Sequence, residues 1–470
     1  MPLIGILLLV ILSTPIQVQS GKPPCPKGIG GSLDTILNHI LPAVMACPPT
    51  LWAKTYGGGG PRSVQQTSDG GFIVAGTKHP ATSLDDFWLL RLDADGNVVW
   101  QKTYSGTETD TATSVDLTSD GGFIVAGLTA SFGVSYGAGG SGFDLWLLRL
   151  DGNGNVVWQK TYGGVSSEGA SDPSVRTMSD GGFVVAGSTL SFGAGSYDFW
   201  LLRLEANGNI AWQRTYGGLG SDDGRSVQPT SDGGFIVAGA TQSFGADAVG
   251  DVWVIRLDAN GNVVWQRTYG GSAGDGAHAV QPTSDGGFIV FGNTESFGAG
   301  LTDVLVLKLD GNGNVLWQKT YGGVNKDRVW SGQSGQITSD GGFIVAGSTN
   351  YLVGTGGEDM WLLRLEGNGN VVWQKTYGVQ GDDRAFSAQV TSDGGLIVGG
   401  SGGRVLRLDA NGSLSASCSL GQASTAVSMN SALVTNDTSA LAFATFSAAT
   451  VTATGVPGVN SSGKVSVQCS

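Results

Sequence analysis

Residues 67–76 read TSDGGFIVAG, and nearly the same ten residues return six more times along the 470-residue chain. The aspartate of this phrase falls at Asp69, Asp120, Asp180, Asp232, Asp285, Asp340 and Asp393, so successive copies are 51 to 60 residues apart. Units of about 50 residues are typical of β-propellers and solenoids, whereas the common helical repeats are shorter. The repeat therefore decides the fold.

Each unit divides into four short runs that are rich in Val, Ile, Trp, Tyr and Thr. In one unit these runs are SVQPTSD (226–232), GGFIVAGAT (233–241), DVWVIRLD (251–258) and NVVWQRTYGG (262–271). The Asp-Gly and Asn-Gly pairs between the runs favour tight hairpin turns, because these residues tolerate the backbone conformations that such turns require. Seven units of four antiparallel strands predict an all-β protein, a seven-bladed β-propeller over residues 51–412.

The two ends of the repeat region predict how the ring closes. The stretch LWAKTYGGGG (51–60) is a fourth-strand phrase without its first three strands, and the last unit has SLSASCSL (413–420) where its fourth strand should come. We expect residues 52–56 to complete the last blade, which would leave no open seam. In the alternative, residues 413–420 close that blade and residues 52–56 add an outer strand.

The N-terminal residues predict export. An apolar run over residues 3–12 is followed by small residues, which is typical of a secretory signal (1–20) cleaved after Ser20. The chain is therefore expected to be secreted or held at the cell surface, with no membrane span in the mature protein. The alternative is an uncleaved membrane anchor.

Two further segments flank the predicted propeller. Residues 21–50 contain a short amphipathic stretch, a candidate helix, and residues 413–470 are rich in Ser and Thr, which predicts a small β appendage or stalk. The only cysteines, Cys25, Cys47, Cys418 and Cys469, lie in these segments. An even count in an exported protein indicates two disulfide bonds. Of the three connectivities we favour the local one, Cys25–Cys47 and Cys418–Cys469.

The charge of the chain argues against nucleic acid as a partner. The formal net charge is −13, and an acidic surface repels phosphate backbones. Two positions of the repeat account for 14 of the 25 lysines and arginines, and the others form no patch in the sequence. Residues that recur in every blade are expected to hold the blades together. The same interpretation applies to twelve of the thirteen tryptophans, which occupy two positions of the repeat.

One repeated phrase resembles a calcium loop. DADGN (93–97) and DGNGN (151–155) match the start of the pattern D-x-[DN]-x-[DN]. The glycine at the sixth position and the glutamate at the twelfth are missing, and a hairpin turn explains the spacing. We therefore expect no cofactor and no metal site, with calcium as the weaker alternative.

The candidate site lies on the face made by the variable loops, because variable loops are where a scaffold usually carries specificity. The loops that lead into the first strand of six blades carry acids: Glu108, Asp110, Glu168, Asp222, Asp223, Asp275, Asp327, Asp382 and Asp383. A ring of carboxylates would bind a cation or a cationic partner. In the alternative, which we favour, each carboxylate accepts hydrogen bonds from the backbone of its own loop.

Aromatic residues of the same loops are the other candidates. Trp330 is the one tryptophan outside the repeat positions, and it lies beside Lys326, Asp327 and Arg328. It is the best single candidate for a ligand contact. The phenylalanines of the SFG phrases are expected to anchor their loops rather than to stack on a sugar: Phe132, Phe192, Phe244 and Phe297.

The phrase order TYGG followed by TSDGGFIVAG resembles the exported seven-bladed β-propeller-repeat proteins of bacteria and archaea, and the match covers residues 51–412. The resemblance implies an extracellular or surface protein and brings no agreed catalytic residues. No GxSxG, HExxH or Walker motif is present. The sequence thus favours a binding or adhesion scaffold for an extracellular glycan, peptide or protein. The alternatives are a polysaccharide lyase or glycosidase and a structural protein of the cell envelope.

Overall fold

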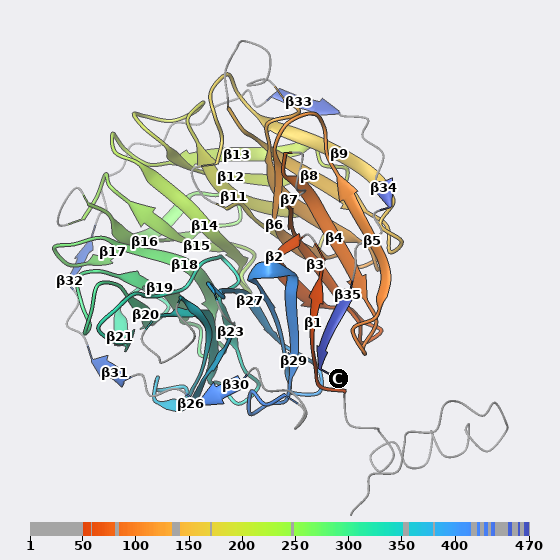
Figure 1. Cartoon of the computed structure of the whole chain (residues 1–470). Helices are drawn as coiled ribbons and strands as arrows, with labels where there is room; N and C mark the ends of the chain where they lie inside the picture. Colours follow the sequence, from red (N-terminus) through yellow and green to blue (C-terminus); the bar gives the residue numbers. More distant parts are fainter. Residues whose placement is uncertain are drawn as a thin grey trace, which may run out of the picture. The chain divides into compact units, whose positions relative to one another are not determined.

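Each copy of the repeat folds into one four-stranded antiparallel sheet, and the seven sheets stand around a common axis like the blades of a propeller (Figure 1). The computed structural model describes residues 50–57, 59–79, 84–133, 142–169, 172–245, 249–350, 357–378 and 381–414, with six short strands beyond them. The predicted signal (1–20) and most of the segment 21–50 lie outside these ranges. Within the described ranges, no helix has the length and apolarity needed to cross a membrane.

The first three blades follow the chain in order. Blade 1 consists of β2 (Gly59–Gln66), β3 (Phe72–Lys78), β4 (Asp86–Leu92) and β5 (Val98–Tyr104). Blade 2 consists of β6 (Asp110–Leu117), β7 (Phe123–Thr129), β8 (Asp144–Leu150) and β9 (Val156–Gly163). Blade 3 consists of β10 (Ser174–Thr177), β11 (Phe183–Thr189), β12 (Asp198–Leu204) and β13 (Ile210–Tyr216).

The next three blades repeat the same order, with one irregular first strand. Blade 4 consists of β14 (Asp222–Pro229), β15 (Phe235–Thr241), β16 (Asp251–Leu257) and β17 (Val263–Gly270). Blade 5 consists of β18 (Asp275–Pro282), β19 (Phe288–Thr294), β20 (Asp303–Leu309) and β21 (Val315–Gly322). Blade 6 consists of β22 (Asp327–Arg328) and β23 (Gly335–Ile337), which both pair with β24 (Phe343–Thr349), then β25 (Asp359–Leu365) and β26 (Val371–Tyr377).

Blade 7 joins the two ends of the ring. It consists of β27 (Ala385–Val390), β28 (Leu396–Gly400), β29 (Arg404–Leu408) and, as its fourth strand, β1 (Trp52–Tyr56). A short 3-10 turn, η1 (Ser401–Gly403), connects β28 to β29. Strand β1 pairs with β29 in the register Trp52↔Arg407 to Thr55↔Arg404. This is the closure that the fourth-strand phrase predicts, and it fastens the beginning of the ring to its end.

The TSDGG phrase makes the turn between the first two strands of each blade. In the first copy, Gly70 adopts a φ of 83°, and the amide of Gly71 donates to Asp69 Oδ1 at 3.2 Å. The same carboxylate accepts two hydrogen bonds from Arg91 of the third strand, at 2.6 Å and 2.5 Å. The aspartate therefore fixes its turn and ties it to the middle of the blade.

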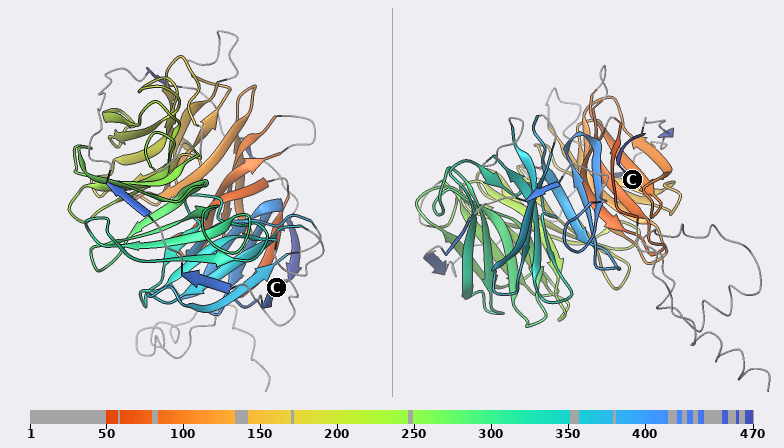
Figure 2. Two further views of the ribbon diagram at one scale, coloured as in Figure 1. Left: turned by 90° about the vertical axis from the view of Figure 1, so that its left-hand side faces the viewer. Right: turned by 60° about the horizontal axis from the view of Figure 1, so that its bottom comes forward.

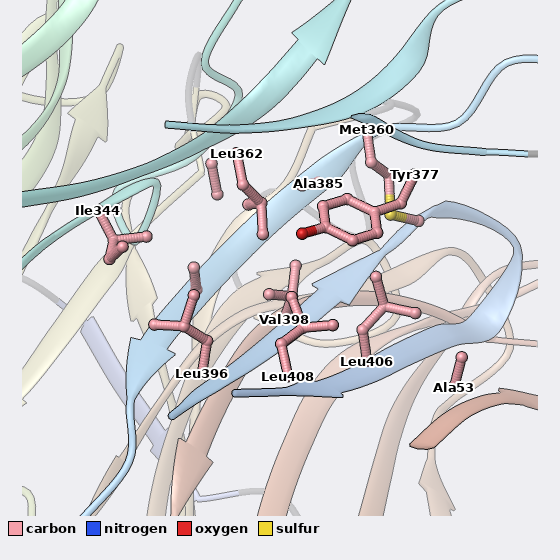
Figure 3. Packing of buried hydrophobic residues seen from close by; sticks show 12 residues of the cluster. Ala53, Ile344, Met360, Leu362, Tyr377, Ala385, Leu396, Val398, Leu406 and Leu408 are labelled. Atoms are coloured by element: carbon pink, nitrogen blue, oxygen red, sulfur yellow. The ribbon is translucent and has the colours of Figure 1, made fainter. Parts of the chain in front are cut away.

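The core lies between neighbouring blades rather than inside one of them. Figure 3 shows the layer between blades 6 and 7, where Leu362 and Tyr377 face Val398 and Leu406. Ala53 of β1 belongs to the same cluster, so the closing strand is packed into the core as well as hydrogen-bonded. Both faces of a blade are apolar because each blade is covered by two neighbours.

Short strands from the C-terminal segment add a fifth strand to six blades, at the outer edge (Figure 1). Figure 2 shows the ring from two further sides, with these short strands again at its rim. They pair with the outermost strands of blades 6, 5, 4, 2, 1 and 7 in that order, opposite to the order of the blades along the chain: β30 (Gly421–Ala423), β31 (Val427–Asn430), β32 (Val434–Asp437), β33 (Thr450–Ala453), β34 (Val459–Asn460) and β35 (Val465–Cys469).

The described parts of this segment thus form no sheet of their own but are distributed around the ring. In blade 3, strand β13 has no fifth strand among the described residues. Cys25, Cys47 and Cys418 lie outside the described residues, and Cys469 is described only by its backbone, opposite Ala53. The two disulfide bonds stay a prediction.

Candidate functional site

The repeated tyrosines, tryptophans and bases of the fourth strands fasten each blade to the next one. In all seven blades the hydroxyl of the tyrosine donates to a glycine carbonyl in the turn that follows the third strand of the next blade: Tyr56, Tyr104, Tyr162, Tyr216, Tyr269, Tyr321 and Tyr377. Trp100 Nε1 and Lys102 Nζ donate to the same turn of blade 2, at 3.1 Å and 2.9 Å. Recurrence in every blade therefore indicates a structural role, as the sequence predicts.

The turn that resembles a calcium loop uses its own oxygens. Asp93 Oδ1 accepts hydrogen bonds from the amides of Asp95 and Asn97, at 3.0 Å and 2.7 Å, and Asp93 Oδ2 accepts one from the Asn97 side chain. This is the hairpin arrangement. A search of the described part of the chain finds no group of three or more His, Cys, Asp or Glu side chains that could hold a metal ion.

The acids that open the first strands are buried. Asp110 is fully buried, and its carboxylate accepts hydrogen bonds from Gly106 N at 2.8 Å and from the hydroxyls of Ser131 and Thr129. Burial raises the pKa of the Asp110 carboxyl, against these hydrogen bonds. The equivalent acids are 0 to 4% exposed: Glu168, Asp222, Asp275, Asp327 and Asp383. Glu168, Asp222, Asp275 and Asp327 each accept a hydrogen bond from a backbone amide of their own loop, the alternative that the sequence favours, whereas Asp383 pairs with Arg404.

The SFG phenylalanines lie against the buried tryptophans of the third strands. The ring of Phe132 is 5.2 Å from that of Trp146, and Phe244 is 5.4 Å from Trp253. Phe192 makes the same contact with Trp200. These three phenylalanines are therefore loop anchors. For Phe297, the structure shows its amide donating to Thr294 Oγ1 in the loop of blade 5.

The repeat departs from its consensus at positions on the innermost strands. In five blades the first strand contains a β-bulge, visible as a shift in the register with the second strand. A bulge re-aims the side chain of its extra residue. That residue differs from blade to blade: Arg62, Thr113, Arg225, His278 and Phe386. The residues that vary most between the repeats therefore lie on the first strands, near the axis of the ring.

Blade 6 departs furthest. Asp327 and Asp340 are 13 residues apart, whereas the equivalent Asp275 and Asp285 are 10 apart. The extra residues interrupt the first strand between β22 and β23 and cross towards other blades. Gln333 Oε1 accepts a hydrogen bond from Ser63 Oγ of blade 1 at 2.7 Å, and Ser331 Oγ donates to the carbonyl of Phe386 in blade 7. Residues 329–334, hereafter the plug, therefore bridge the central channel.

A pocket of about 450 Å3 lies beside the plug, between blades 4, 5 and 6. At its centre, His278 Nε2 faces Arg225 Nη1 at 3.2 Å and the side-chain amide of Asn293 at 3.0 Å. Burial, followed by the charges of Arg225 and Arg328, lowers the pKa of His278 well below its usual range. Both neighbouring groups are N–H donors, so Nε2 accepts these bonds. Gly276 lies in the wall of the pocket, and a Cβ built on it would meet no atom closer than 3.5 Å.

Trp330 belongs to both the plug and the pocket wall. Its Nε1 donates to Ser348 Oγ at 2.8 Å. Two guanidinium groups lie near its ring, Arg384 at 4.6 Å and Arg328 at 5.9 Å from the ring centroid. Arg384 is held in turn by Glu358 at 2.6 Å. These contacts fix the orientation of an aromatic surface beside the cavity.

The structure brings together four of the residues predicted for the site. Trp330, Arg328, Asp223 and Asp275 all line the pocket, although the Asp275 carboxylate is used by the Gly271 amide and the Ser296 hydroxyl. The other predicted residues lie elsewhere. Asp222 and Asp327 are buried beside the pocket, Lys326 is exposed outside it, Asp382 pairs with Arg384, and Asp110, Glu168 and Asp383 belong to other blade junctions.

The sequence reasoning missed Arg225, His278, Asn293 and Glu295. A signal for His278 and Asn293 was present: from blade 4 to blade 5 the phrase RSVQP (225–229) becomes HAVQP (278–282), and FIVAGAT (235–241) becomes FIVFGNT (288–294). Three arginines outside the repeat positions come together here. Arg225 and Arg328 line one pocket, and Arg328 and Arg384 lie near one tryptophan ring, each with acids beside it.

Comparison with known proteins finds similarity of fold. No family model matches the chain. The chain is 22% identical over 362 residues to the regulatory protein FlaEY of Caulobacter vibrioides, covering 71% of this chain and 37% of that protein, so it spans little more than a third of that relative. Two solved structures are similar: the WD40 β-propeller domain of Doa1 (TM-score 0.45, 15% identity, 77% of this chain and 96% of that one) and the WD40 domain of Neurospora crassa Pan2 (TM-score 0.44, 11% identity, 76% and 90%). At these identities the similarity concerns the fold alone.

Proposed function

We propose that the protein is an exported binding scaffold that holds sugar units of an extracellular glycan in the pocket between blades 4, 5 and 6. The observation that carries this proposal is the internal comparison of the seven repeats. Their packing residues hardly vary, whereas the bulge residues and their neighbours vary, and in blades 4 to 6 these variable positions line one cavity. Variable loops and strand ends on a rigid framework are the usual place for specificity.

The composition of the pocket supports a sugar. Sugars offer hydroxyl groups that both donate and accept, together with an apolar ring face. The pocket provides a carboxylate in Asp223, a guanidinium group in Arg225 and an aromatic side chain in Trp330. Its volume of about 450 Å3 lies within the usual range for small-molecule sites. The apolar run over residues 3–12 supports export, which would bring the pocket into contact with extracellular polysaccharides.

The test is a glycan array probed with the full chain, followed by affinity measurements on Gly276→Val. The added side chain would occupy the pocket, and the backbone at Gly276 accepts a Cβ without a clash. Gly60→Val is the matched control, because Gly60 holds the same position in blade 1 and its Cβ would meet no atom closer than 3.8 Å. We expect binding to fall at least 10-fold in Gly276→Val only. Equal binding by both variants would contradict the proposed site, and turnover of a bound polysaccharide would favour the enzyme alternative.

A further inference from the structure

We propose that the pocket selects acidic sugars and that Arg225 and Arg328 bind the carboxylate of a uronate unit. This inference rests on the proposed function and names the class of glycan. It starts from a difference in ion pairing between the arginines at the repeat positions and the arginines that line the pocket.

The arginines of the repeat have closed pairs. Arg91 donates from Nη2 to both carboxylate oxygens of Asp69, at 2.6 Å and 2.5 Å, and its side chain is 9% exposed. Arg225 and Arg328 have only distant acidic partners, Asp223 at 3.5 Å and Glu295 at 4.0 Å. A guanidinium group carries five N–H donors in a fork that matches a carboxylate. The two pocket arginines thus retain donors for a ligand.

The two arginines approach a common point from different blades. Arg225 comes from blade 4, with its Nη1 3.2 Å from Nε2 of His278 in blade 5, and Arg328 comes from blade 6. Both side chains line the same cavity and are 26% and 27% exposed. An anionic group in the cavity can therefore be bound from two blades.

The acids of the same pocket favour a carboxylate over a phosphate. Asp223, Asp275 and Glu295 line the cavity with the two arginines, so the formal charges of its lining sum to −1. A phosphate monoester carries up to two negative charges and would be repelled more strongly than a carboxylate, which carries one. Asp223 and Glu295 can instead accept hydrogen bonds from sugar hydroxyls, and Trp330 forms part of the wall beside them. An acidic peptide would supply fewer hydroxyl donors for these carboxylates.

The probe is digalacturonate, compared with the same disaccharide after reduction of its carboxyl groups to primary alcohols. The two differ only in the carboxylates. Titration calorimetry on the full chain should show at least 10-fold tighter binding of digalacturonate, and this preference should shrink as salt is raised. Arg225→Gln and Arg328→Gln should each weaken digalacturonate binding about 10- to 100-fold and weaken binding of the reduced disaccharide by a smaller factor, so that the preference between the two disaccharides shrinks. Arg225→Lys keeps the positive charge but loses the two-pronged guanidinium group, so its affinity for digalacturonate should lie between those of the unaltered protein and Arg225→Gln.

Arg62→Gln is the matched control, because Arg62 is the bulge residue of blade 1 and also has a distant acidic partner, Asp172 at 3.5 Å. It should bind digalacturonate like the unaltered protein. Equal affinity for both disaccharides, equal loss in Arg62→Gln, or tighter binding of inorganic phosphate or an acidic peptide would overturn the inference. Equal affinity for both disaccharides would leave the proposed function standing. Binding of neither disaccharide, together with an empty glycan array, would reject the proposed function itself.

Discussion

Ser63 of blade 1 donates a hydrogen bond from its Oγ to Gln333 Oε1 of blade 6 at 2.7 Å, although the two residues are 270 positions apart. This hydrogen bond joins two blades that are not neighbours in the ring, because blade 7 stands between blades 6 and 1. Gln333 also approaches Ser387 of blade 7 at 3.3 Å and Ser114 of blade 2 at 3.4 Å. One side chain thus contacts three other blades across the centre of the ring.

Replacing Gln333 should loosen the centre of the ring. We expect Gln333→Ala to lower the free energy of unfolding by about 1–3 kcal/mol, because it leaves buried hydroxyl groups without their acceptor. Denaturant unfolding measures this loss. A double-mutant cycle with Ser63→Ala isolates the pair, and the two changes should cost less together than the sum of the single changes. Strict additivity would show that the two residues are not coupled.

The tyrosine that docks on the next blade should contribute to stability in every copy. Tyr321→Phe removes a buried hydroxyl that donates to the Gly369 carbonyl at 2.6 Å, so we expect a loss of about 1–3 kcal/mol in the free energy of unfolding. Tyr197→Phe is the control, because Tyr197 stands outside the repeat position and is half-buried. Equal effects of the two substitutions would contradict the docking role.

Stability should rise as the pH is lowered from neutral to about 4.5. Burial, reinforced by the charge of Asp222, raises the pKa of Asp198 to about 7, and burial raises that of Asp303, which lies near Asp327, to about 6. Between about pH 4 and 7 the folded protein therefore binds more protons than the unfolded chain, so these groups stabilise the fold at acidic pH and this contribution is lost as the pH rises through 6 to 7.

At still lower pH a second group of carboxyls acts in the opposite direction. Hydrogen bonds from Thr118 and Arg149 lower the pKa of Asp120 to about 2, so its contribution is present above about pH 4 and is lost as the pH falls towards 2. The urea midpoint should thus be higher at pH 4.5 than at pH 7.5. The double variant Asp198→Asn with Asp303→Asn should flatten the difference. A midpoint that is higher at pH 7.5 would show that the buried carboxyls do not control the dependence.

The fold was predictable because its determinants are local and are repeated seven times. A turn phrase such as TSDGG and an alternating apolar strand carry the same meaning in each copy, and the stray phrase at residues 51–60 indicated the closure. The pocket was less predictable. Whether Asp222 is a ligand or an anchor depends on its burial, and the meeting of Arg225 with His278 depends on two bulges in neighbouring blades. The burial of Asp222 and the contact between Arg225 and His278 both depend on how neighbouring blades pack, which the sequence of a single repeat does not show.

The C-terminal strands should protect the outer edges of the blades. Removal of residues 415–470 leaves the outermost strands β17 and β21 without the backbone partners that β32 and β31 provide. We expect faster amide hydrogen exchange in these two strands. Strand β16, which keeps both of its neighbours β15 and β17 in the shortened chain, is the internal control and should exchange at an unchanged rate. Unchanged exchange in β17 and β21 would contradict the pairing.

The most direct test of the central claim is the affinity of Gly276→Val and Gly60→Val for the glycan that the unaltered protein binds best. Both glycines hold the same position of the repeat, and both accept a Cβ without a clash. Only Gly276 lies in the pocket between blades 4, 5 and 6. The account predicts at least 10-fold weaker binding for Gly276→Val, with Gly60→Val and both melting temperatures unchanged. Equal affinity of the two variants would contradict it.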